Sequence, residues 1–372
     1  MTNNERLYLI ALTFVKGVGD VLARHLLQYF GQAEAIFREK KNVLEKVPGI
    51  GEYTAAGIVA TKGEALQRAE RELAFVEKNR IRLYTITEED YPVRLRECPD
   101  APIVFYYRGN ADLNVKRILS VVGTRRVTDY GKNLTASLLK DLSEIFPDLL
   151  IISGLAYGVD VQAHRQALKN GLPTVGVLAH GLDRIYPATH RNVAVEMLKD
   201  GGLMTDFPSE TTPDRENFLK RNRLIAGLAD ATVVVESAEK GGALNTADIA
   251  FSYSRDVYTF PGRVDDEHSK GCNRLIQSNK AGLITSAGDL IMALGWETGE
   301  HAESPRQEKL TFHNPLPDHP VIEALAGNGS MQINDLALAM NTPVYQLSSM
   351  LFELEMAGHV KAMPGGVYKI NR

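Results

Sequence analysis

The chain has little cysteine and lacks any long apolar run. Its only two cysteines, Cys98 and Cys272, stand far apart and without metal-ligand spacing. That usage excludes a disulfide framework and is typical of a reducing cytoplasm. Nowhere do about 18 apolar residues run together, so the sequence predicts no transmembrane helix. The start, MTNNERLYLIALT, has no basic region before an apolar core, and we expect no targeting segment.

An excess of positive charge is also missing. The formal net charge is -4 and the isoelectric point is near 6.2, so nucleic-acid binding must come from local clusters of cations rather than from bulk charge. Hydrophobic residues make up 44% of the chain, which is ordinary for a globular protein. A length of 372 residues predicts two or three domains.

Two familiar nucleotide motifs are absent. The first apolar strand is followed by GTRRVTDYG, in which Arg125 stands where the dinucleotide fingerprint G-x-G-x-x-G has its second glycine. The ATP-binding pattern GxxxxGK[ST] is missing as well, so we expect no cofactor and no metal. An arginine at this first turn is a forked donor for phosphate oxygens. The alternative for a single arginine is a solvated surface side chain.

From Val115 to about Ala293, apolar strands alternate with helical patterns. This alternation predicts an α/β fold with a doubly wound parallel sheet, whose ligands lie beyond the carboxyl ends of the strands. The turns at those ends carry most of the glycine and much of the arginine. The predicted strands are 118–122, 149–152, 174–178, 203–205, 231–235 and 257–260.

The segment FLKRNRLIAGLADATVVVESAEKGGALNT, residues 218–246, joins a basic helix, a buried strand and a glycine loop. Gly241-Gly242-Ala243 opens a helix predicted from Leu244 to Ser254, and such a helix start directs backbone N–H groups and a positive dipole at an anion. We therefore predict a ligand that combines phosphate with a base. The positive charges upstream are Lys220, Arg221 and Arg223, and the ring is Phe218.

Residues 1–80 have a helical pattern with two Gly-x-Gly turns, at residues 17–19 and 49–51, each resembling a helix-hairpin-helix turn. Glycines there let backbone amides approach a DNA phosphate. The acidic neighbours Asp20 and Glu52 favour the alternative, in which the turns only join packed helices. Residues 81–110 are predicted to be a connecting arm that contains a strand-like stretch at 103–107.

The polar, proline-bearing residues 297–320 are predicted to be a linker. Residues 321–372 follow with three helices and a hairpin that turns at Pro364-Gly365-Gly366, a pattern that resembles a winged helix. The third helix has Glu353 and Glu355 but no lysine or arginine. Because phosphate affinity rests on cations, this composition favours protein contact or packing over DNA reading.

Four ordered motifs resemble the DNA-processing protein A family, also called DprA or Smf. They are SGLAYGVDVQAH (153–164), GVLAHGLDRIYPATH (176–190), FLKRNRLIAGLADATVVVESAEKGGALNTADIA (218–250) and TFPGRVDDEHSKGCNRLI (259–276). Four motifs in one order make the resemblance specific. The flanking helix-hairpin-helix-like and winged-helix-like segments extend it to nearly the whole chain.

The resemblance implies a non-enzymatic cytoplasmic protein that dimerises and binds single-stranded DNA through an extended Rossmann-like domain, residues 81–296. It would protect incoming DNA and load a RecA-type recombinase during natural transformation. Tyr157 stands where the family often has a basic residue. The DNA site implied for this chain comprises Arg125, Ser153, Gly154, Lys220, Arg221, Gly241, Gly242, Ala243, Leu244 and Thr246, with Phe218 as the candidate for base stacking.

Several polar side chains have two interpretations. Arg221 and Arg223 cannot share a face of a helix, so we favour Arg221 as the DNA ligand. Arg223 is then structural, paired with Asp230 or Glu236. Asp160 and His164, at i and i+4, are either an acid/base pair or a pair that caps and orients its own helix. His180, Asp183 and His190 have irregular spacing, which favours local hydrogen bonds over a metal site.

An enzyme is the alternative function. Gly241-Gly242 with Thr246 resembles the PGGxGTxxE loop of nucleoside-monophosphate phosphoribohydrolases, although it is one residue too long. The glutamate of that loop falls at Ile249, which cannot act as an acid or stabilise a developing cation. Asp248 is adjacent to it but faces elsewhere on the helix. A protein-interaction scaffold with a vestigial nucleotide pocket is a third alternative.

Overall fold

The structure is a computed structural model that describes residues 2–296, 319–363 and 366–370. The chain divides into two compact units, Met1–Gly299 and Glu300–Arg372. The predicted linker lies outside the described residues except at its last two positions, and Pro320 is the first residue of a helix rather than linker. In the predicted hairpin turn, only Gly366 is described. In the described part of the chain, no helix has the length and hydropathy that crossing a membrane requires.

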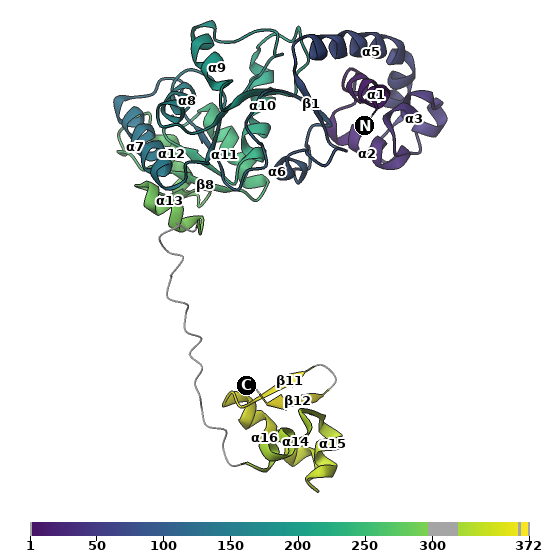
Figure 1. Cartoon of the computed structure of the whole chain (residues 1–372), viewed down its shortest axis with the longest axis vertical. Helices are drawn as coiled ribbons and strands as arrows, with labels where there is room; N and C mark the ends of the chain where they lie inside the picture. The colour runs from purple at the N-terminus through teal and green to yellow at the C-terminus, as the bar shows by residue number, and fades with distance from the viewer. Residues whose placement is uncertain (1, 297–318, 364–365, 371–372) are drawn as a thin grey trace. The chain divides into compact units, whose positions relative to one another are not determined.

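The first unit is built around one mixed sheet of nine strands in the order β1-β2-β6-β5-β4-β3-β7-β8-β9 (Figure 1). Neighbours from β6 to β9 in this order pair in parallel, which requires the intervening helices as crossovers. The strands are β1 Arg82–Thr85, β2 Val104–Gly109, β3 Ile118–Val122, β4 Leu150–Ser153, β5 Thr174–Val177, β6 Gly202–Thr205, β7 Ala231–Val234, β8 Asp256–Thr259 and β9 Gly282–Leu283.

The segment predicted as a connecting arm, residues 81–110, contributes two strands to the sheet: the strand-like stretch predicted at 103–107 is β2, whereas β1 was not predicted. β2 pairs antiparallel with β6, and β1 pairs antiparallel with β2. The arm thus extends the parallel sheet at its β6 edge. Phe105 and Tyr106 are buried on opposite faces of β2, like residues of a central strand.

Alternation within β3 shows why the sheet needs helices on both sides. Ile118 and Val122 belong to one apolar cluster, whereas Leu119 and Val121 belong to another, because successive residues of a strand point to opposite faces. All four are buried. A strand that is apolar on both faces is stable only inside a three-layer arrangement.

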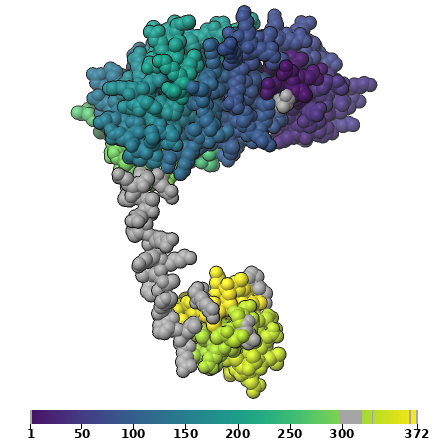
Figure 2. Space-filling view, viewed as in Figure 1, coloured from purple at the N-terminus to yellow at the C-terminus, as the bar shows by residue number. Residues whose placement is uncertain are grey.

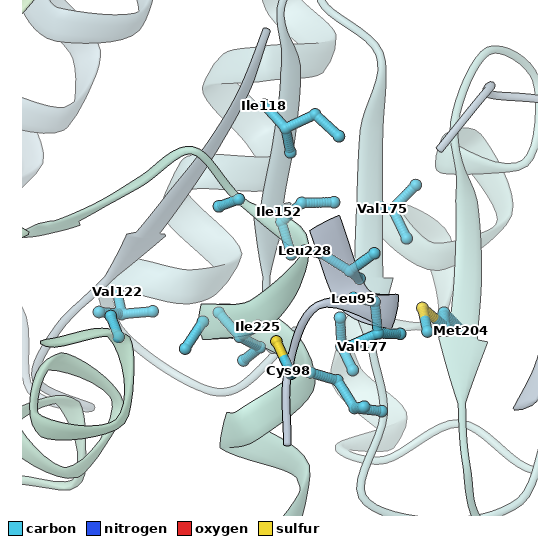
Figure 3. Close-up of a cluster of buried hydrophobic side chains, with 14 of the residues drawn as sticks. Leu95, Cys98, Ile118, Val122, Ile152, Val175, Val177, Met204, Ile225 and Leu228 are labelled. Atoms are coloured by element: carbon cyan, nitrogen blue, oxygen red, sulfur yellow. The ribbon is translucent and has the colours of Figure 1, made fainter. Parts of the chain in front are cut away.

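Helices α10, α11 and α12 cover one face of the sheet, and α7, α8 and α13 cover the other. Figure 3 shows part of the first layer, where Ile225 and Leu228 of α10 lie near the side chains of β3, β4 and β5. The helices of this region are α6 Val93–Arg96, α7 Asp129–Ile145, α8 Val159–Lys169, η1 Ala188–His190, α9 Arg191–Met197, α10 Arg215–Leu228, α11 Gly242–Ser252, α12 Lys270–Gln277 and α13 Ala287–Ala293.

The N-terminal helices form their own apolar cluster, which continues onto Leu83 of β1 and Val104 of β2. In Figure 2 the surface of the first unit runs without a break from these helices, in purple and blue, to the teal sheet region. The boundary predicted at residue 80 stays a prediction, since this core spans it. The helices are α1 Asn3–Thr13, α2 Asp20–Phe30, α3 Ala33–Arg38, α4 Lys41–Leu44 and α5 Glu52–Lys78.

Both Gly-x-Gly turns lead into helix starts, with Gly19 and Gly51 as the N-caps of α2 and α5. After the first turn, the Asp20 carboxylate accepts the Ile103 N–H at 3.1 Å and faces Arg223 at 2.9 Å. Burial raises the pKa of this carboxyl, against the effect of the arginine. This acid therefore fastens the helices to the sheet, in agreement with a packing role for the turn.

The second unit has three helices and a small antiparallel sheet in the order β10-β12-β11. Its core includes Val321, Leu325, Leu336, Leu347 and Leu351, which are apolar positions at helical spacing and are buried. The elements are α14 Pro320–Asn328, β10 Ser330–Gln332, α15 Ile333–Ala339, α16 Val344–Met356, β11 Val360–Met363 and β12 Val367–Ile370.

Candidate functional site

A hollow of about 670 Å³ lies beyond the carboxyl ends of the parallel strands, where open α/β sheets bind ligands. We refer to it as the rim hollow. The turn after β3, the starts of α8 and α11, and the first half of α10 surround it. Its lining includes Gly123, Thr124, Arg125, Asp160, Tyr186, Asp214, Arg215, Phe218, Arg221, Asn222, Lys240, Gly241, Gly242, Ala243 and Thr246.

Four cations and two carboxylates line the rim hollow, although the chain as a whole is negatively charged. Arg125, Arg215 and Lys240 are exposed and so present their charges to solvent. Of the two carboxylates, Asp214 caps α10 by accepting the Asn217 N–H at 2.8 Å. Local clustering thus supplies the positive charge that the composition lacks.

The turn that carries Arg125 is held at both ends by one residue of the neighbouring strand. The Thr124 N–H donates to the backbone oxygen of Glu236 at 2.7 Å, and the Thr128 N–H donates to Oε2 of the same residue at 2.9 Å. The Thr128 hydroxyl also donates to Oε1 of Glu236. Since Glu236 is 1% exposed, its carboxylate acts as an internal clamp that orients the arginine turn.

The glycine loop supplies backbone donors to the same hollow. Gly241 is the N-cap of α11 and has no side chain to occupy the first amides of the helix, so these N–H groups and the helix dipole point outward. Gly242, Ala243 and Thr246 line the hollow. Leu244 does not, since its N–H donates to the Gly241 oxygen at 3.2 Å and its side chain packs on the core.

Arg221 forms the floor of the rim hollow and is only 3% exposed. Its Nη1 donates to the Gly154 oxygen at 2.7 Å and to the Val177 oxygen. Burial lowers the pKa of Arg221 to about 10, although the nearby Asp160 carboxylate opposes the shift. Burial also raises the pKa of Asp160, against the arginine. This pair sets the charge at the base of the site.

Ser153 and Gly154, both predicted as site residues, build the layer below the floor instead of lining the hollow. Ser153 is fully buried, and its hydroxyl donates to the Val121 oxygen at 2.6 Å. A Cβ on Gly154 would lie 2.5 Å from Nη1 of Arg221, so only glycine allows the guanidinium this position. The two residues therefore contribute by placing Arg221.

Two rings stand at the side of the hollow. The Phe218 ring lies 5.1 Å from the Arg125 guanidinium carbon and 5.7 Å from that of Arg221. Each such contact contributes about 0.5–1 kcal/mol at an exposed site. Tyr186 lies 6.0 Å from Phe218, tilted by 53°, and is 46% exposed. Together the rings offer an apolar surface of the size of a nucleobase beside the cations.

Lys220 is not brought to the rim hollow. It points to the other side of α10, where it lines a second hollow with Arg223, the first helix-hairpin-helix turn and Asp206. We refer to this second space, of about 660 Å³, as the junction hollow. A helix turns by 100° per residue, so Lys220 and Arg221 must face different surroundings. The sequence analysis assigned both residues to one site, because a sequence shows their charges but not the directions of their side chains.

The partners expected for Arg223 were wrong. Its guanidinium donates to Asp20 at 2.9 Å, to Asp206 and to the Asp100 backbone oxygen, whereas Asp230 pairs with Arg94. Burial lowers the pKa of Arg223, but the two carboxylates outweigh burial and raise it. Arg223 thus has a structural role, as expected, but its partners are Asp206 and the distant Asp20.

The remaining candidate side chains have local partners. Asp160 holds the loop before α8, whose N-cap is Gly158, and the His164 Nδ1 lies 2.7 Å from the Thr174 hydroxyl. Burial lowers the pKa of His164 to about 3. His180 and His190 each contact a backbone oxygen. No cluster of three or more metal-ligating side chains occurs in the part of the chain that the structure describes.

Tyr157, which stands at the usually basic position of the family, lies outside the lining of the rim hollow. It is 47% exposed and meets the His190 ring at 4.9 Å in an edge-on contact. The charged and aromatic lining residues that the sequence analysis missed include Arg215, Lys240 and Tyr186. Arg215 begins α10 and Lys240 precedes the glycine loop, so their positions offered a signal, whereas Tyr186 comes from a distant loop.

Three family models match the chain. The first, described as DNA recombination-mediator protein A, matches residues 82–295. A DprA winged helix domain matches 307–366, and a SAM-like helix-hairpin-helix tandem matches 9–61. The order of these matches agrees with the described elements and defines a modular protein with a Rossmann-like sheet between two small helical modules. The chain belongs to the DNA recombination-mediator protein A family, known as DprA or Smf.

Curated relatives support this family along most of the chain. Protein Smf of Synechocystis is 34% identical over 302 residues, which are 79% of this chain and 74% of that protein. The putative DNA processing protein DprA of Mycobacterium tuberculosis is 36% identical over 314 residues, 81% of this chain and 80% of that one. DprA of Bacillus subtilis is 32% identical over 295 residues, 79% and 98% of the two chains.

Two solved structures resemble the chain. DprA from Streptococcus pneumoniae superposes with a TM-score of 0.65 and 29% identity, over 77% of this chain and 97% of that one. DprA from Helicobacter pylori gives a TM-score of 0.51 and 28% identity, over 57% and 95%, and was described for its single-stranded DNA binding mode. The predicted fold class is confirmed, with a helix-hairpin-helix module before the sheet domain in the sequence and a winged-helix module after it.

Proposed function

We propose that the rim hollow binds single-stranded DNA with little sequence preference. The observation that carries this proposal is the convergence of exposed cations, free helix-start amides and two rings on one rim of the sheet. Cations and amides suit a phosphate backbone, and aromatic faces accept any unpaired base. In a duplex the base faces are already stacked, so the rings favour single strands.

Adjacent arginines offer a matched test. Arg125 lines the rim hollow, whereas Arg126 is equally exposed and lies outside its lining. We expect Arg125→Ala to weaken binding of a fluorescent oligo-dT by tenfold or more, and Arg126→Ala to weaken it by less than threefold. Anisotropy titrations measure both, and thermal melts should agree within a few degrees. Equal affinities of the two variants would remove the rim hollow as the site.

Salt dependence tests the phosphate contacts separately. Each phosphate that a cation neutralises steepens the fall of log K with log salt by about 0.7 for single strands. Loss of Arg125 should therefore flatten the slope by roughly that amount, while Arg126→Ala should leave it unchanged. A slope near zero for the wild-type chain would contradict backbone binding.

The family description, a recombination mediator, supports a role after the strand is bound. We propose that the chain protects incoming single-stranded DNA in the cytoplasm and loads a RecA-type recombinase onto it during natural transformation. The test is recombinase filament formation on DNA coated with a single-strand-binding protein. The wild-type chain should accelerate it, and Arg125→Ala should not. Acceleration without DNA binding would separate the two roles.

The surroundings of the candidate catalytic acids favour a binding protein over an enzyme. The Glu236 carboxylate is occupied by Thr128 and buried, and Asp248 is exposed and paired with Lys280 at 2.6 Å. Ile249, at the place of the hydrolase glutamate, packs against the core. Incubation with AMP tests the alternative. Release of adenine that is lost in Glu236→Gln would favour a hydrolase and count against a purely binding role.

A homodimer is proposed as well. Among the residues that the structure describes, β9 is the last strand of the sheet and has no strand on its outer side, a feature that favours association. Leu283 on this strand is 51% exposed, and Met292 on the neighbouring α13 is 78% exposed. We expect the wild-type chain to run as a dimer in light-scattering chromatography and Met292→Glu to shift it toward monomer. An unchanged mass would assign the interface elsewhere.

A further inference from the structure

Helix α16 presents an apolar stripe on the side that faces away from its own core. Leu347, Leu351 and Leu354 are buried in the second unit. About 180° around the helix, at positions i, i+7 and i+11, stand Tyr345, Phe352 and Met356, which are 72%, 64% and 74% exposed. These side chains are exposed among the described residues of the second unit, and we refer to them as the α16 stripe.

The helix before it carries one more exposed apolar side chain. Leu338 is 81% exposed near the end of α15, six residues before α16 begins. Single exposed apolar residues are normal, but several on one small unit mark an interaction site. With four such side chains, the unit has a contact surface that its own fold leaves open.

The charged residues of α15 and α16 are all acidic. Glu353 lies on one flank and Glu355 on the other, as the helical angles of 180° and 20° from Val344 require. Neither α15 nor α16 carries a lysine or an arginine. Because DNA affinity rests on cations, this helix offers a DNA duplex no positively charged side chain.

We propose that the α16 stripe docks a basic amphipathic segment of a partner protein. The occupant is a helix whose apolar residues cover Tyr345, Phe352 and Met356 and whose lysines or arginines lie beside the two glutamates. This is recognition of an amphipathic helix by an apolar face, with charge complementarity that selects the partner. Large aromatic side chains are the residues that dominate the affinity of such contacts.

The test uses the full chain and two synthetic helical peptides. Both repeat leucine along one face, and the flanks of that face carry lysine in one peptide and glutamate in the other. Fluorescence anisotropy should show that the lysine peptide binds at least tenfold more tightly than the glutamate peptide. Phe352→Ser should weaken binding of the lysine peptide at least tenfold. Tyr345→Ser, on the same stripe, should weaken it as well.

Charge reversal separates docking from general stickiness. Glu353→Lys should weaken the lysine peptide and strengthen the glutamate peptide, because only the flank has changed. Tyr53→Ser, which removes a 78% exposed ring from α5, is the matched control and should leave both affinities unchanged. Circular dichroism melts of the variants check that the second unit stays folded.

Three outcomes would overturn the proposal. Equal binding of the two peptides, or no loss with Phe352→Ser and Tyr345→Ser, would show that the stripe does not select basic partners. A concentration-dependent association that Phe352→Ser abolishes would assign the stripe to a second copy of this chain. Displacement of the lysine peptide by duplex DNA, but not by single strands bound at the rim hollow, would assign it to DNA.

Discussion

Arg221 and Arg223 stand two residues apart on α10, yet they serve different sides of the molecule. Arg221 lies beneath the rim hollow and donates to two backbone oxygens. Arg223 lies beside the junction hollow and is enclosed by the carboxylates of Asp20 and Asp206. The first lies close to the buried Asp160 carboxylate beneath a ligand site, whereas the second pairs with two acids where the helical module packs on the sheet.

The difference follows from helix geometry and not from residue type. Two residues turn the helix by about 200°, so one arginine meets the rim of the sheet and the other meets α2. Identical side chains thereby acquire opposite pKa shifts, lowered for Arg221 by burial and raised for Arg223 by its two acids. Loss of Arg223 should therefore affect stability alone, and loss of Arg221 should affect both stability and binding.

The largest effect is expected from Arg223→Met. Removing one partner of a buried ion-pair cluster leaves two carboxylates uncompensated and costs about 3–5 kcal/mol of unfolding free energy. Affinity of the folded protein for oligo-dT should change less than threefold. Denaturant unfolding measures the first quantity, and anisotropy below the transition measures the second.

Arg215→Met is the control, because it removes an exposed arginine from the same helix. Its unfolding free energy should change by less than about 0.5 kcal/mol. If Arg223→Met were as stable as this control, the acids around Arg223 would contribute nothing to the junction between helices and sheet.

Arg221→Lys should give a smaller loss of stability together with a loss of binding. A single ammonium cannot reproduce the planar fork that meets the Gly154 and Val177 oxygens. Loss of charged hydrogen bonds of this kind costs about 2 kcal/mol. Oligo-dT affinity should fall about tenfold, or about 1.4 kcal/mol, since the positive charge at the floor of the rim hollow is no longer held in a fixed position. Unchanged affinity would mean that Arg221 only supports the fold.

Low pH should lower the unfolding free energy of the protein through protonation of His164. Its pKa is about 3 in the folded chain and near 6.5 when unfolded, so the unfolded state binds more protons between these values. Stability is therefore complete above about pH 6.5 and falls as the pH drops toward 3. In His164→Gln the slope of unfolding free energy should decrease by up to about 1.4 kcal/mol per pH unit. His25→Gln, at an exposed position on α2, should keep the wild-type slope.

Local pattern was enough to predict most of the sheet. The apolar run of β3 was predicted with its observed bounds, Ile118–Val122, because a strand that is buried on both faces is continuous in hydrophobicity. The winged helix followed in the same way from helical spacing and a hairpin. β1 was not predicted and β2 was predicted only as a strand-like stretch within an arm, since the antiparallel pairing of β2 with β6 depends on residues about a hundred positions away.

The sequence predicted the parts of the rim hollow that lie in glycine and arginine turns, together with Phe218 and Arg221 of α10. Arg125 and the Gly241-Gly242 loop carry such local signals, and both line it. Tyr186 carries none, because its ring meets Phe218 only after the loop beyond β5 folds over the rim. The acids of Arg223 were equally invisible, since Asp20 is separated from it by 203 residues.

Lys220→Ala should have the smallest effect, and it completes the comparison of the two sides of α10. Its side chain lines the junction hollow and is exposed, so neither the floor of the rim hollow nor the core depends on it. We expect oligo-dT affinity to fall less than threefold through general electrostatic attraction, and this residual effect should vanish in high salt. A tenfold loss that persists in salt would instead mean that the strand crosses α10 and enters the junction hollow, and the two sides of the helix would then form one binding surface.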